Sequence, residues 1–138
     1  MYKKEFQIIE DFKNIFILKS IPFNLSELAH EFNYINGRVD ILCSNSYGEI
    51  YAFEAKLSKW RIALNQAYRN SSFAHYSYVI LPFSKINLAI KYSNEFLRRN
   101  VGLCSIAPDS IDIIIKAPKN KPLQPWLTNS AINFIESQ

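Results

Sequence analysis

The sequence has few of the features that mark cysteine-bound metal sites, secretion or membrane insertion. It contains only two cysteines, Cys43 and Cys104, whereas a cysteine-rich metal site needs closely spaced pairs. Each lies in an apolar stretch, so we predict two buried thiols. No apolar run approaches the roughly 20 residues that cross a bilayer. The charged N-terminus also has no apolar core and cleavage site typical of a signal peptide. We therefore expect a cytoplasmic protein without membrane association.

Neither positive nor negative charge strongly dominates the chain. Sixteen basic residues face twelve acidic ones, which leaves a net charge of +4. This modest excess fits a polyanionic partner better than an acidic one, because basic surfaces attract phosphate backbones. Of the 138 residues, 49% are hydrophobic and 14% aromatic. That content excludes a disordered chain and can fill the core of one domain, which we assign to residues 1–138.

Hydrophobic periodicity and turn residues predict strands that alternate with helices in the second half of the chain. We expect helices over Tyr2–Asn14, Ser58–Ser72, Ser84–Asn100 and Thr128–Glu136. We expect strands over Phe16–Phe23, Arg38–Ser44, Glu49–Lys56, Tyr76–Leu81, Gly102–Ala107 and Ile111–Ala117, with a polar connection and a helical turn over 24–36. The hairpin over 38–56 implies antiparallel pairing, and the later alternation implies parallel pairing. The predicted fold is α/β, a mixed β-sheet flanked by α-helices.

The most informative stretch is the hairpin, which carries two acids and a lysine. Asp40 lies on its first strand, and Glu54 and Lys56 lie near the end of the second. Because side chains alternate along a strand, Glu54 and Lys56 point to the same side, with the Ala55 carbonyl between them. Two carboxylates and a carbonyl oxygen are ligands that a hard divalent cation prefers. The hairpin therefore predicts a metal site with a lysine beside it.

Such a site suits phosphodiester hydrolysis. A bound magnesium ion lowers the pKa of its water and polarises a phosphoryl oxygen. A neighbouring lysine can stabilise the developing charge or orient the water. Without a metal, the two carboxylates would repel each other, and one would take up a proton.

The pattern V-D-(13 residues)-E-A-K resembles the core motif of the PD-(D/E)xK nuclease superfamily, which includes restriction endonucleases and archaeal Holliday-junction resolvases. The resemblance covers roughly the first 80 residues, and Val39 stands where the motif has its proline. It implies a restriction endonuclease-like fold and a nuclease that uses Mg²⁺ (or Mn²⁺). Asp40 and Glu54 would hold the metal together with the carbonyl of Ala55, and Lys56 would support the nucleophile. We expect DNA rather than RNA as substrate, because most of the resembled families cut DNA.

Two further side chains are candidate catalytic residues. Many superfamily members carry a glutamate on the first helix, and helical phase favours Glu5, which falls within the apolar stripe of that helix. Glu10 falls about 140° away, on the solvated side. Gln66 resembles a glutamine that several branches place near the active-site water or phosphate. A solvated helix face explains Gln66 equally well, and fraying of the N-terminus would explain Glu5.

Targeting and substrate binding leave alternatives open. A group of basic and aromatic residues near the C-terminus could contact nucleic acid, although we favour a solvated loop with one core tryptophan: Lys116, Lys119, Lys121 and Trp126. Because one domain leaves little room for separate recognition, specificity could come from a homodimer or a targeting partner protein. The rival function is a non-catalytic nucleic-acid-binding or assembly module that retains the nuclease fold, because function resides in sites rather than folds.

Overall fold

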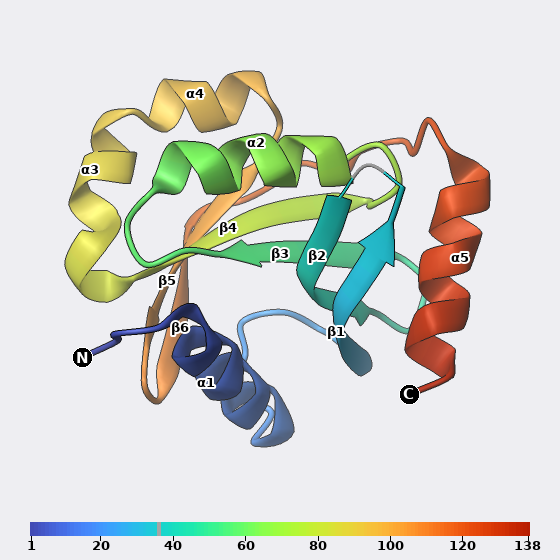
Figure 1. Cartoon of the computed structure of the whole chain (residues 1–138), viewed down its shortest axis with the longest axis horizontal. Helices are drawn as coiled ribbons and strands as arrows, with labels where there is room; N and C mark the ends of the chain where they lie inside the picture. The colour runs from blue at the N-terminus through green and yellow to red at the C-terminus, as the bar shows by residue number, and fades with distance from the viewer. Residues whose placement is uncertain (36) are drawn as a thin grey trace.

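The computed structural model describes residues 1–35 and 37–138, which form a mixed β-sheet with helices on both faces (Figure 1). Its strands follow one another in chain order: β1 (Glu27–Tyr34), β2 (Gly37–Ser44), β3 (Ile50–Ala55), β4 (Tyr76–Pro82), β5 (Gly102–Ala107) and β6 (Ser110–Ile115). The pairs β1–β2, β2–β3 and β5–β6 are antiparallel, whereas β3–β4 and β4–β5 are parallel. The predicted α/β mixed sheet and its hairpin are thereby confirmed.

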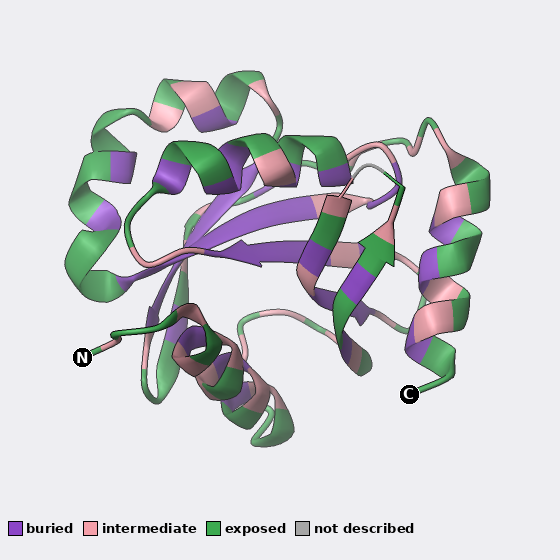
Figure 2. Cartoon of the chain, viewed as in Figure 1, coloured by how far each residue is buried: buried purple, intermediate pink, exposed green. Residues whose placement is uncertain are grey.

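The helices are divided between the two faces of the sheet. Helix α1 (Glu5–Ile17) packs on one face. The other face carries α2 (Trp60–Asn70), the short η1 (Phe83–Lys85), α3 (Ile86–Lys91), α4 (Ser93–Arg98) and, over β1 and β2, α5 (Pro125–Glu136). The central strands are buried on both sides, as Figure 2 shows. No helix in the described residues is long and apolar enough to cross a membrane.

Alternation along β3 directs its side chains to two separate cores. Phe53 and Ala55 pack under α1, whereas Ile50 and Ala52 face the opposite side. Glu54 follows the second set and therefore points toward α2. Glu54 is buried because the apolar residues on either side of it in β3 place the strand in the interior.

Helix α2 lies close against this second face through a stripe of mostly small residues. Trp60, Ala63, Leu64 and Ala67 are buried. The next buried residue is Asn70. Asn70, at this polar end of the stripe, faces the sheet beside Glu54.

Two predictions about the segment between α1 and β2 are wrong. Residues 16–23 form no strand: α1 extends to Ile17, because its apolar period continues through Ile15, and Ile21 and Phe23 then pack against the core from a non-regular segment. Residues 27–34 form β1 instead of a polar connection with a helical turn. As an edge strand, β1 tolerates exposed polar side chains while its backbone pairs with β2. Asn36, the last residue of that predicted connection, lies outside the described residues.

The helix expected over 84–100 is divided into η1, α3 and α4. The break between α3 and α4 falls at Tyr92, whose φ of −107° and ψ of 30° depart from helical values. There its ring stacks on Trp60 at 5.5 Å between centroids, so tertiary packing overrides local periodicity. Trp126 is also not a core residue, because 65% of it is exposed on α5. Cys43 and Cys104 are buried free thiols, as predicted.

Candidate active site

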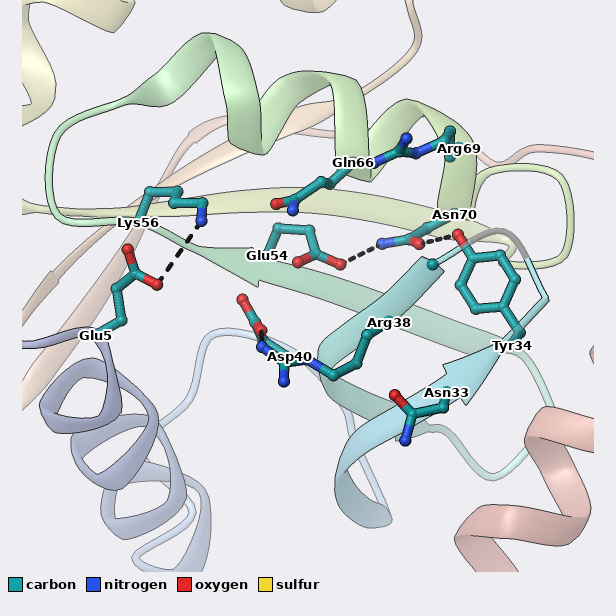
Figure 3. A pocket seen from close by; sticks show the side chains of 11 residues that line it. Glu5, Asn33, Tyr34, Arg38, Asp40, Glu54, Lys56, Gln66, Arg69 and Asn70 are labelled. Carbon is teal, nitrogen blue, oxygen red and sulfur yellow. Dashed lines mark hydrogen bonds and ion pairs between the residues drawn. The ribbon is translucent and has the colours of Figure 1, made fainter.

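The pairing of β2 with β3 brings Asp40 and Glu54 together. Ile41 lies opposite Phe53, so Asp40 and Glu54 are the next residues along the two strands and share one face of the sheet. The Asp40 carboxylate accepts a hydrogen bond from the Ala55 N–H, with 2.9 Å between Oδ2 and N. The bond holds Asp40 across the end of β3, where Ala55 and Lys56 follow Glu54. The two carboxylates of the motif therefore point into one cavity (Figure 3).

That cavity has a volume of about 500 Å³ and is lined by side chains from both faces of the fold. Its lining includes the five side chains that the sequence predicts for the site: Glu5, Asp40, Glu54, Lys56 and Gln66. Six further residues complete the wall: Asn33, Tyr34, Gly37, Arg38, Arg69 and Asn70. Glu10 is exposed on the outer side of α1, so the helical phase separated the two glutamates correctly.

Glu54 is the most deeply buried ionisable side chain of the cavity, with 1% of it exposed. Burial raises its pKa to about 9, and the neighbouring charge of Asp40 acts in the same direction. A hydrogen bond from Asn70 and the positive charge of Lys56 oppose this rise. In the metal-free protein Glu54 therefore holds a proton at neutral pH, which relieves the repulsion between the two acids.

A chain of hydrogen bonds orients Glu54 from the α2 side. Asn70 Nδ2 donates to Glu54 Oε2 at 2.6 Å, and the Tyr34 hydroxyl donates to Asn70 Oδ1 at 2.8 Å. Burial, followed by the charge of Glu54, raises the pKa of Tyr34. Sequence reasoning missed both roles, although Asn70 lies four residues after Gln66 and hence on the same face of the helix. Tyr34 had no comparable signal, because its strand was not recognised.

The basic side chains of the cavity are held loosely. Lys56 Nζ lies 3.7 Å from Glu5 Oε1, and 22% of the lysine and 44% of the glutamate side chain are exposed. Arg38 approaches Asp40 Oδ1 at 3.9 Å and is 60% exposed. Such long, hydrated pairs contribute little to stability. Both cations can therefore turn toward an anionic substrate at small cost.

The donor atoms suit a hard cation that keeps part of its water shell. Among the described residues, no group of three or more His, Cys, Asp or Glu side chains could hold a metal ion. Asp40 and Glu54 supply two carboxylates, and the Ala55 carbonyl belongs to the same strand end. Magnesium typically binds through one or two carboxylates and retains several waters. In addition, Gln66 Oε1 is buried with no hydrogen-bond donor among the described residues, so an ordered water would satisfy it. The residues present fit a hydrated Mg²⁺ ion.

Comparison with known proteins identifies a similar fold but no family. No family model and no curated protein match the chain. A solved structure of SPO1766, a protein of unknown function from Silicibacter pomeroyi, aligns with a TM-score of 0.59 and 19% identity over 80% of this chain and 71% of that one. A repair endonuclease from Pyrococcus abyssi and Pyrococcus furiosus SfsA in complex with Ca²⁺ both align with a TM-score of 0.48.

The two Pyrococcus proteins are 13% and 12% identical to this chain over 78% of its length, which corresponds to 49% of the endonuclease and 61% of SfsA. Their similarity is too distant to support an argument about function. The alignment with SPO1766 supports the α/β fold alone.

Proposed function

We propose that this chain is a metal-dependent nuclease of the PD-(D/E)xK type that hydrolyses phosphodiester bonds in DNA. The observation that carries the proposal is the convergence of Asp40, Glu54 and Lys56 on one cavity, in the order and spacing of the motif. The raised pKa of Glu54 adds support, because a buried pair of carboxylates is costly unless a cation or a proton compensates.

Asp40, Glu54 and the Ala55 carbonyl would hold Mg²⁺ (or Mn²⁺). When bound, the ion supplies a more acidic water and a polarised phosphoryl oxygen. Glu54 must release its proton to become a ligand, and Asn70 then holds the free carboxylate in place through its amide N–H. Asp40 accepts the Ala55 N–H through Oδ2, so Oδ1, the oxygen nearer to Arg38, would be available to a cation.

Lys56 acts on the substrate rather than on the metal. A charged lysine offers three donors and no lone pair, so it cannot be a ligand but can contact a phosphate oxygen or orient the attacking water. In the free protein the ammonium lies 3.7 Å from Glu5 Oε1, a weak pair that a phosphate can displace. Gln66 lines the same cavity, where its amide would contact the attacking water or the phosphate.

The test is a Mg²⁺-dependent cleavage assay on linear, supercoiled, single-stranded and branched DNA, with RNA included. We expect cleavage of at least one DNA substrate by the wild type and by the exposed-site control Glu10→Ala, and none by Asp40→Ala. Cleavage by Asp40→Ala at the wild-type rate would show that Asp40 is not part of the active site. If no substrate is cut and no metal is bound, the non-catalytic nucleic-acid-binding module becomes the better explanation. Dimerisation and a targeting partner remain predictions.

A further inference from the structure

A second, larger cavity adjoins the candidate active site. Its volume is about 740 Å³, and it lies between the C-terminal end of α2 and the segment that leads into α5. The lining residues are Tyr34, Tyr68, Arg69, Ser71, Ser72, Asn120, Lys121, Leu123 and Gln124. Tyr34 and Arg69 line both cavities, so the second is an extension of the first. We refer to it as the α2 groove.

The α2 groove differs from the first cavity in its charge. The first has three acidic and three basic side chains in its wall, whereas the α2 groove has Arg69 and Lys121 and no acidic residue. Tyr68 is 54% exposed along it. Asn120 Nδ2 is buried in its wall with no acceptor among the described residues. The two cations and the exposed aromatic ring together match the phosphates and bases of a nucleic-acid strand.

The far wall of the groove is held by backbone hydrogen bonds to the loop that follows α2. The N–H groups of Leu123 and Gln124 both donate to the Ser72 carbonyl at 3.0 Å, and the Asn120 N–H donates to the His75 carbonyl at 2.7 Å. Figure 1 shows this segment passing the end of α2 before it enters α5. Because backbone bonds fix both walls, little ordering would be needed for a ligand to bind.

A third cavity continues the path beyond the α2 groove. It is about 320 Å³ in volume and shares Asn120 and Lys121 with the groove. Lys119 also lines it, although its ammonium is paired with Glu49 at 2.6 Å. Basic residues thus follow one line of cavities away from the acidic pair, from Arg69 to Lys121.

We propose that the α2 groove binds unpaired DNA nucleotides that adjoin the phosphate to be cut, with a base stacked on Tyr68 and the backbone contacted by Arg69 and Lys121. This inference rests on the proposed function. The strand is unpaired because base faces inside a duplex are covered by their neighbours, whereas an exposed ring such as Tyr68 stacks on a base that has left the helix. The substrate class is therefore DNA with a single-stranded segment.

The experiment measures fluorescence anisotropy of a labelled oligothymidylate and of a labelled duplex, in EDTA so that no metal-dependent cleavage occurs. We expect the wild type to bind the single strand more tightly. Tyr68→Ala should weaken that binding by about 5-fold or more, the loss expected for one base–aromatic stack, and Tyr68→Phe should restore it. Lys121→Ala should weaken binding and flatten its salt dependence. Tyr47→Ala, an 84% exposed tyrosine in the β2–β3 turn outside the groove, should bind like the wild type.

The result that overturns the inference is unchanged single-strand binding by both Tyr68→Ala and Lys121→Ala, tighter binding of the duplex, or no binding by the wild type. The outcome is separable from that of the proposed function, because the binding assay needs no metal. Loss of binding in Tyr68→Ala without any cleavage by the wild type would support the groove and refute the nuclease. If the wild type cleaves DNA, but Tyr68→Ala and Lys121→Ala bind the single strand as tightly as the wild type does, the nuclease is supported and the groove is refuted.

Discussion

Glu54→Gln should stabilise the metal-free protein at neutral pH while it removes the metal site. The glutamate is 1% exposed, and its pKa is about 9 in the folded chain against 4.5 in the unfolded chain. Between these values the folded protein holds a proton that the unfolded chain has lost. The contribution of this group to stability is therefore fully present below pH 4.5 and declines as pH rises toward 9.

The magnitude follows from the pH interval. From 4.5 to 7 is about 2.5 pH units, at about 1.4 kcal/mol each, so the wild type should lose about 3–4 kcal/mol of unfolding free energy through this group. This is an upper bound, because Asp40 takes part in the same titration. Glutamine stays neutral, and its carbonyl can still accept the hydrogen bond from Asn70. The variant should not show this decline.

Urea unfolding in EDTA at pH 5, 6, 7 and 8 measures the difference. The unfolding free energy of the wild type should fall with pH relative to that of Glu54→Gln, and the exposed-site control Glu10→Gln should follow the wild type. Mg²⁺ at pH 8 should stabilise the wild type and leave Glu54→Gln unchanged, because only the native protein with both carboxylates binds the ion. Parallel pH profiles for wild type and Glu54→Gln would show that folding does not raise the pKa of Glu54.

Three further substitutions test the roles of Lys56, Asn70 and Gly102. Lys56→Ala should lower kcat by about 100-fold or more and leave Mg²⁺ affinity nearly unchanged; paired cleavage and metal titrations would show this, and cleavage at the wild-type rate would contradict the role. Asn70→Ala removes a bond that lowers the pKa of Glu54, so metal binding at pH 7 should weaken and recover at higher pH; a loss that does not depend on pH would indicate a merely structural role. Gly102→Ala should lower the unfolding free energy by about 1–3 kcal/mol, because a Cβ there overlaps the Tyr78 ring and comes within 2.7 Å of the Ile115 carbonyl oxygen; an unchanged urea midpoint would contradict it.

The parts of the site that could be predicted are those governed by local periodicity. Alternation on a hairpin placed Asp40, Glu54 and Lys56 around one point, and helical phase distinguished Glu5 from Glu10. Both rules depend on the chain within one or two elements. Their chemical roles remain proposals.

The parts that could not be predicted depend on contacts between distant elements. Edge strand β1 carries polar residues that resemble a connection, and only its pairing with β2 makes it a strand. Tyr34 on this strand reaches Asn70 on α2, 36 residues later, so the hydrogen-bond chain to Glu54 has no local signature. The break at Tyr92 likewise arises from stacking on Trp60 rather than from its own neighbours in sequence.

The most direct test of the central claim is a calorimetric titration of Mg²⁺ into the metal-free protein, for wild type and Asp40→Ala, at pH 7 and pH 8. We expect one ion per wild-type chain, tighter binding at the higher pH because Glu54 must lose its proton, and little or no binding by Asp40→Ala. No binding by the wild type at millimolar Mg²⁺, or equal binding by Asp40→Ala, would contradict it.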